Sequence, residues 1–173
     1  MRFALFLAFL AAAPAAFAHP ETVAGGAAIG FAHPFTGWDH LLAMVIVGVW
    51  AARYRGLARL ALPSAFAGGM LAGALLGLAG IPFPALEPMI LASIVVFAAA
   101  LAAAARIPPA AGVALIALFA LAHGYAHLAE MPGEAMVGAF AAGMLAGTAV
   151  LHAIGLGVGL AIGWRAPRFS VSR

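Results

Sequence analysis

Long apolar stretches with very few charges dominate this chain and most constrain its fold. After residue 18 they run over about 33–52, 60–80, 87–105, 109–129 and 135–164. Four are close to the roughly 20 residues that a helix needs to cross a bilayer, and the last suits one tilted helix. The stretches are continuous rather than alternating, which favours helices over a membrane barrel. We therefore expect an all-α, polytopic integral membrane helix bundle, with five transmembrane helices in a single domain over residues 19–173.

Composition excludes the soluble alternatives. Hydrophobic residues make up 66% of the 173 residues and charged residues only 8%, whereas a soluble domain carries about 25% charged residues. A disordered chain is excluded because such chains are poor in apolar residues. There is no Cys, so disulfides, Fe–S clusters and thiolate metal sites are excluded. The basic residues are scattered between apolar stretches, which argues against nucleic acid as a partner.

The first 18 residues are typical of a secretory signal peptide. A short positive start precedes an apolar stretch, and Ala16-Phe17-Ala18 has the small-x-small form of a cleavage site. Cleavage there would leave His19 as an extracytoplasmic N-terminus. Five spans would then place every remaining Arg on the cytoplasmic side, as the positive-inside rule expects. We expect a multi-pass protein of the bacterial inner membrane, with its N-terminus outside and its C-terminus inside.

Glycine and tryptophan predict packing and depth. Gly recurs at every fourth position at 69, 73 and 77, and again at 143 and 147 and at 155, 159 and 163, a spacing that lets helices approach closely in lipid. Gly-Met-Leu-Ala-Gly occurs at both 69–73 and 143–147, which we interpret as packing composition rather than as an inverted repeat. Trp38, Trp50 and Trp164 lie near span ends and are expected to anchor at the membrane interface.

Polar residues gather at the outer ends of the expected spans, where a polar side chain is by default a functional candidate. If residues 33–52 form one helix, His33 and His40 lie within about 20° of one face, and Asp39 can ligate beside His40 or orient it. Gly37 clears space near that face. The candidate metal-site residues are His33, Asp39, His40, Glu87, His123, His127 and Glu130, with His152 and His19 as secondary candidates.

The donor set is nitrogen and carboxylate oxygen. Such ligands suit Ni²⁺, Co²⁺ or Zn²⁺, whereas Ca²⁺ and Mg²⁺ need more oxygen ligands. No nucleotide-binding loop of the Gly-x-x-x-x-Gly-Lys-Ser/Thr type is present, so no ATPase is implied. The sequence therefore predicts a secondary transporter for a divalent metal ion, with no permanently bound cofactor and with the lipid bilayer as its surroundings. Oligomeric state, energy coupling and the choice among the three ions stay open.

Two segments resemble the signatures of a known family, the hydrogenase/urease accessory nickel permeases (HupE/UreJ). Residues 33–40, His-Pro-Phe-Thr-Gly-Trp-Asp-His, resemble its His-Pro-x-x-Gly-x-Asp-His motif. Residues 122–130 resemble Phe-His-Gly-x-Ala-His-Gly-x-Glu, with Ala122 and Leu128 departing from the pattern. The resemblance extends over essentially the whole chain. It implies import of nickel, or cobalt in some members, for metalloenzyme maturation, and it implies that the seven candidate residues matter for transport.

Two other functions use the same residues. An intramembrane zinc-dependent hydrolase would hold a catalytic Zn²⁺ with an open coordination position. A haem-binding electron carrier would use paired His ligands. The absence of His-Glu-x-x-His and Gly-x-Ser-x-Gly motifs argues against the familiar protease and esterase chemistries. We therefore expect a permease and not an enzyme.

Overall fold

The computed structural model describes residues 23–103, 107–133 and 136–163, and these form a bundle of α-helices. The predicted signal peptide, His19 and Trp164 lie outside the described residues. The helices, in chain order, are α2 (Val23–Ala32), α3 (Trp38–Ala51), α4 (Ala61–Leu78), α5 (Leu86–Ala102), α6 (Pro109–Ala129) and α7 (Val137–Ala161). Two 3₁₀ turns, η2 (His33–Phe35) and η3 (Gly56–Leu60), precede α3 and α4.

Within the described residues, three helical segments are long and apolar enough to cross a bilayer. They are Gly56–Leu78, Pro109–Ala129 and Val137–Ala161, with 23, 21 and 25 residues. Two further apolar helices are shorter, Trp38–Ala51 and Leu86–Ala102. The all-helical fold is thus confirmed together with three span-capable helices, and a count of five spans stays a prediction.

The first expected span is not one helix. Residues 33–52 were predicted to be continuous, but α2 ends at Ala32, η2 follows, and α3 begins only at Trp38. Pro34 lacks a backbone N–H and suits a first turn, and Gly37 has an extended backbone with φ −94° and ψ 117°. The motif at 33–40 is therefore a break between two helices. The Gly/Ala-rich α2, which precedes the break, was not predicted.

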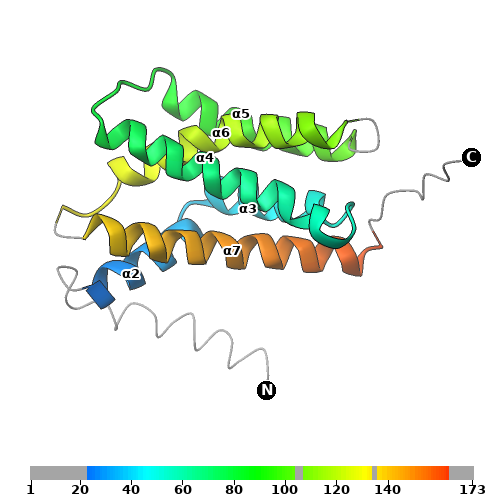
Figure 1. The fold of residues 1–173 in the computed structure, drawn as a ribbon, viewed down its shortest axis with the longest axis horizontal. Helices are drawn as coiled ribbons and strands as arrows, with labels where there is room; N and C mark the ends of the chain where they lie inside the picture. Colours follow the sequence, from blue (N-terminus) through cyan, green and yellow to red (C-terminus); the bar gives the residue numbers. More distant parts are fainter. Residues whose placement is uncertain (1–22, 104–106, 134–135, 164–173) are drawn as a thin grey trace, which may run out of the picture.

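The helices form two groups joined by α3 (Figure 1). α4 packs against α6, and α5 packs against α6 and α3. On the other side, α2 and α3 both pack against α7, the long orange helix in Figure 1. α3 also contacts α4 and α5, and α4 contacts α7 as well, so α3 provides most but not all of the contact between the two groups.

The glycine stripes lie at the closest helix contacts, as predicted, except for Gly163, which follows the end of α7 and has nothing within 4 Å of an added Cβ. In α4, a Cβ on Gly73 would collide with the Leu121 carbonyl of α6. In α7, a Cβ on Gly143 would collide with the Ala27 carbonyl of α2, and one on Gly155 would collide with the Val45 carbonyl of α3. Close backbone approach therefore stabilises the packing of α4 on α6 in one group and of α7 on α2 and α3 in the other.

The order of these contacts also gives the relative direction of the paired helices. Along α4, Gly69 and then Gly73 meet Ala117 and then Leu121 of α6, so the two helices run parallel. By the same reasoning α7 runs parallel to the α2–α3 pair, because its contacts advance from Ala27 to Val45. Helices of the expected first and fifth spans thus share one direction, as do those of the second and fourth.

One interfacial prediction is wrong. Trp50 is fully buried in the main hydrophobic core, together with Val47, Leu62 and Phe66. Its ring lies against Gly112, where an added Cβ would sit 3.1 Å from Trp50 Cζ2. Trp38, by contrast, is 66% exposed. Position near a span end could not distinguish Trp50 from Trp38. Burial depends on whether a neighbouring helix leaves room for the indole ring, as α6 does at Gly112.

Candidate metal centre

Three buried histidines from two helices form the first cluster, here called the inner cluster. His40 comes from the first turn of α3, and His123 and His127 lie one turn apart on α6. Each offers one ring nitrogen, and these three atoms lie within 4.8 Å of one another. Two nitrogens on one ion at about 2.1 Å each can be at most about 4.2 Å apart. The three ligand atoms therefore need to move inward by less than 1 Å or so to share one ion.

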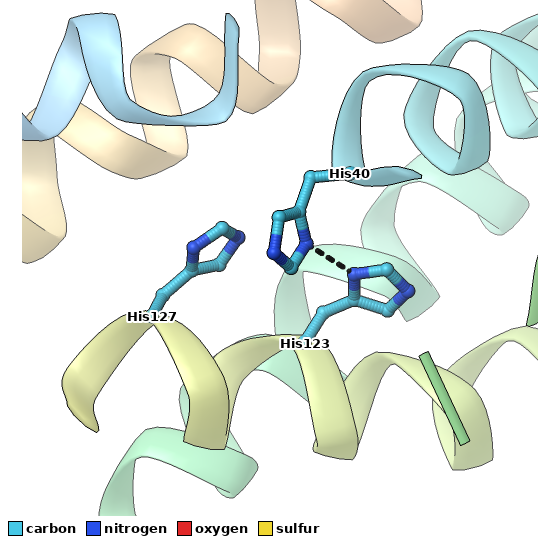
Figure 2. A group of neighbouring side chains, drawn as sticks. All are labelled: His40, His123 and His127. Carbon is cyan, nitrogen blue, oxygen red and sulfur yellow. Dashed lines mark hydrogen bonds between the residues drawn. The ribbon is translucent and has the colours of Figure 1, made fainter. Parts of the chain in front are cut away.

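His40 is the central member of the inner cluster. Its Nδ1 lies 2.8 Å from Nδ1 of His123, the contact drawn as a dashed line in Figure 2. Its ring centroid lies 4.2 Å from that of His127. Figure 2 shows the His40 ring between the other two, with its second nitrogen on the side of His127. The three imidazoles thus meet between α3 and α6.

A second group, the outer cluster, contains His33, His127 and Glu130. Its three ligand atoms also lie within 4.8 Å of one another. His33 Nε2 and Glu130 Oε2 are 3.0 Å apart, and the Glu130 side chain is 47% exposed. A pocket of about 240 Å³ lies beside this pair. It is lined by His33, Thr36, Gly37, Asp39, His40 and Glu130.

His127 belongs to both clusters. It is 2% exposed, yet neither of its ring nitrogens has a hydrogen-bond partner among the described residues. A buried polar group without a partner is costly and calls for an explanation. A cation at this position would provide the missing partner for whichever ring nitrogen is not protonated.

Other candidate residues lie around the clusters rather than in them. Asp39 lines the outer pocket, and its Oδ1 accepts the backbone N–H of His40 at 2.8 Å. Glu87, in the first turn of α5, is exposed and belongs to neither cluster. His152 of α7 is buried against Phe66, at 5.2 Å between ring centroids, and also lies outside both. The structure thus joins five of the seven main candidates.

Glycines make room for these side chains. A Cβ at Gly37 would sit 2.8 Å from Cδ2 of His40 and 2.9 Å from Oδ1 of Asp39, so the expected clearance is confirmed. A Cβ at Gly124 would collide with the backbone of Met70 in α4. Because Gly124 lies between the two histidines of α6, its close approach to α4 fixes the position of both.

Ser93 and Phe66 also contact the site and were not predicted. Ser93 Oγ lies 2.9 Å from Nε2 of His123, and the Phe66 ring packs 5.4 Å from that imidazole. Ser93 had a signal in the sequence, since it is the one hydroxyl residue in the stretch 87–105. Phe66 had none, because one more aromatic residue in an apolar helix is ordinary.

Comparison with known proteins gives a family match and a similar curated protein. Residues 7–173 match the family described as HupE / UreJ protein. Protein HupE of Rhizobium leguminosarum bv. viciae is 38% identical over 152 residues, which cover 88% of this chain and 80% of that protein. No solved structure matches. The apolar helices and the family together indicate a membrane location. With a match over nearly its whole length, the chain belongs to the HupE/UreJ family.

Proposed function

We propose that this protein is a permease that imports a divalent transition metal ion across the bacterial inner membrane. Ni²⁺ is the ion we propose first, and Co²⁺ is the second choice. Membership of a family associated with nickel and cobalt transport for hydrogenase and urease supports this assignment. We further propose that the imported ion serves maturation of such a metalloenzyme. The ion is the cargo, so the protein needs no resident cofactor.

One observation carries the proposal: the inner and outer clusters share His127. The outer cluster borders a pocket and includes an exposed carboxylate, whereas the inner cluster is buried. An ion bound first by Glu130 and His33 can be transferred to His40 and His123 while it stays bound to His127. Each step then exchanges only some of its ligands.

The donor types support a borderline ion rather than a hard or soft one. Imidazole suits Ni²⁺, Co²⁺ and Zn²⁺, and no thiolate is present to favour Cu⁺. Carboxylates at the entrance offset the charge of a dication as it loses water. Asp39 adds a second carboxylate to the lining of that pocket.

The membrane potential is a sufficient driving force for this scheme. With the outer cluster on the extracytoplasmic side, an inside-negative potential contributes about 2.3 kcal/mol per charge per 100 mV, and about twice that for a dication. Facilitated diffusion therefore accumulates the ion without ATP. In this topology the N-terminus is outside, the C-terminus is inside, and residues 1–18 are removed as a signal peptide.

Uptake of labelled metal tests the proposal. Cells that express the wild type or His40→Ala are given Ni²⁺, Co²⁺ or Zn²⁺ in turn, with membrane protein quantified in each strain. Leu75→Ala, which changes an exposed α4 side chain, is the control. We expect nickel accumulation by the wild type and the control and almost none by His40→Ala. Equal accumulation in all strains would contradict the assignment of the site.

The three imidazoles of the inner cluster also favour one alternative, an intramembrane zinc hydrolase. Catalytic zinc is often held by three protein ligands with one position open. Purified protein loaded with Zn²⁺ and offered lipid and peptide substrates distinguishes the two. Hydrolysis without ion movement into proteoliposomes would favour the hydrolase, and ion movement without hydrolysis supports the permease.

A further inference from the structure

Ser93 connects the inner cluster to the backbone of a third helix. It lies in α5, is fully buried, and contacts two groups. Its Oγ is 2.6 Å from the carbonyl oxygen of Ile90 and 2.9 Å from Nε2 of His123. The three groups form a chain that runs from the α5 backbone to the imidazole.

The direction of these hydrogen bonds follows from the number of hydrogens. A hydroxyl has one hydrogen to donate and lone pairs to accept with. Two oxygens 2.6 Å apart repel unless a hydrogen lies between them, and a carbonyl has none, so Ser93 donates to Ile90. Ser93 can then only accept from the imidazole. Nε2 of His123 therefore carries the hydrogen.

This assignment sets the state of two further atoms. A neutral imidazole protonated at Nε2 has a bare Nδ1, and Nδ1 of His123 is the atom that faces His40 at 2.8 Å. For that contact to be a hydrogen bond, Nδ1 of His40 must be the donor. Nε2 of His40 is then bare as well. His40 thus offers a free lone pair at Nε2. The lone pair of His123 Nδ1 accepts the hydrogen of His40 Nδ1 and becomes available once that hydrogen bond opens, so neither histidine has to lose a proton to ligate.

We infer that Ser93 is a positioning residue that holds His123 in its Nε2–H tautomer, and through it His40 in its Nδ1–H tautomer. The inference rests on the proposed function, in which the inner cluster binds the transported ion. Partners of this kind fix the orientation and the ligating atom of metal-binding histidines. The hydroxyl contacts no ion itself and acts only through His123.

Loss of the Ser93 hydroxyl would reverse the tautomers of His123 and His40. In Ser93→Ala, an Nε2–H on His123 would be a buried donor without an acceptor, which is costly. Moving that hydrogen to Nδ1 lets His123 donate to Nδ1 of His40, and His40 then carries its hydrogen on Nε2. The lone pairs at His123 Nδ1 and His40 Nε2 are both lost.

Nitrogen NMR of full-length, metal-free protein in nanodiscs tests the tautomers directly. With ¹⁵N-labelled histidine, a bare ring nitrogen resonates far downfield of a protonated one, and spectra of His123→Gln and His40→Gln identify the two signals. We expect a bare Nδ1 on His123 in the wild type and in Ser93→Thr. In Ser93→Ala we expect a protonated Nδ1. A protonated Nδ1 on His123 of the wild type would overturn the inference.

Metal binding gives the second measurement, with Co²⁺ as a coloured probe and Ni²⁺ as competitor. Loss of the hydrogen-bond partner of a metal-binding histidine typically weakens metal affinity by about 10–100-fold. We expect Ser93→Ala to bind Co²⁺ more weakly by this factor and Ser93→Thr to bind it as the wild type does. Thr148→Ala is the control, since Thr148 is a buried hydroxyl residue on α7 whose Oγ1 donates to Met70 Sδ rather than to a residue of either cluster. Equal affinity of Ser93→Ala and the wild type would overturn the inference.

The two measurements separate this inference from the proposed function. If the wild type binds neither Co²⁺ nor Ni²⁺, the proposed function fails, and the role of Ser93 in metal binding fails with it. The tautomer assignment would then still be decided by the nitrogen spectra. If the wild type binds metal and Ser93→Ala binds it equally well, only the inference about Ser93 fails.

Discussion

The inner and outer clusters share His127 and differ in what surrounds it. The outer cluster adds one half-exposed carboxylate and His33, which follows the end of α2. The inner cluster adds two further imidazoles, all buried between α3 and α6. The outer cluster, beside solvent, therefore carries the negative charge, and the buried inner cluster contains only neutral donors.

In the proposed function, this difference would help a hydrated cation to enter an apolar bundle. A carboxylate beside water attracts the ion at a small desolvation cost, whereas a buried, unpaired carboxylate would be expensive whenever the ion is absent. Neutral imidazoles are cheaper to bury and still replace water as ligands. The change from charged to neutral donors thus follows the change from open to buried surroundings.

Removing the shared residue should have the largest effect. His127→Ala takes a ligand from both clusters. Loss of a residue that only supports a metal ligand lowers metal affinity or activity by about 10–100-fold. Because His127 is itself a proposed ligand, we expect nickel uptake to fall by about 100-fold or more. The measurement is accumulation of labelled nickel per amount of membrane protein. His152→Ala, which changes a buried histidine outside both clusters, is the control. Comparable losses in both variants would contradict a special role for His127.

Changing the charge at the entrance should weaken capture more than transfer. Glu130→Gln keeps the shape of the side chain and removes its charge. We expect the half-saturating nickel concentration to rise about tenfold, which corresponds to about 1.4 kcal/mol of lost attraction, with the maximal rate changed less than twofold or so. Initial rates over a range of nickel concentrations separate the two effects. A lower maximal rate at unchanged half-saturation would reverse the assigned roles of the clusters.

A crowding substitution should affect the inner cluster without removing any ligand. In Gly37→Ala the new methyl group would sit 2.8 Å from the His40 ring, and the backbone at φ −94° accepts alanine. We expect the maximal transport rate to fall by roughly tenfold, since moving a functional side chain by about 1 Å can lower a rate by up to about 100-fold. Gly68→Ala is the matched control because nothing lies within 4 Å of its added Cβ. Equal rates in both variants would show that His40 has room to move.

External pH should have the smallest effect. Histidine binds a metal ion only as the neutral imidazole, and its ordinary pKa is about 6.5. As the external pH falls below about 6, protons compete with the ion for histidine ligands that it meets on entry, so uptake should decline by roughly threefold between pH 7.5 and 5. Uptake in Glu130→Gln should decline over the same range. A flat profile in the wild type would count against histidine ligation at the entrance.

Much of the site was predictable because it depends on spacing along helices. His123, His127 and Glu130 follow the i, i+4, i+7 pattern of one helical face, and α6 has the predicted bounds Pro109–Ala129. The glycine stripes predicted close packing for the same reason. Such local periodicities survive folding wherever the helix is continuous.

The rest depends on contacts between helices, for which one sequence carries little signal. The break at η2 needed the combined effect of Pro34 and Gly37, each of which is also compatible with a helix start. The exclusion of Glu87 from both clusters depends on where α5 packs. The burial of Trp50 and the contact of Ser93 with His123 likewise depend on neighbouring helices. Residue type alone identified the chemistry but not these positions.

The lack of a carboxylate in the inner cluster has a consequence for how long an ion stays there. In the proposed function, three neutral ligands would leave the charge of a bound dication to be offset only by carboxylates outside the inner cluster, such as Asp39. Incompletely compensated charge is disfavoured in buried surroundings. If the inner cluster binds the transported ion, as proposed, the energy well for that ion is shallow there. This arrangement sacrifices retention and favours rapid turnover, as suits a conduit rather than a reservoir.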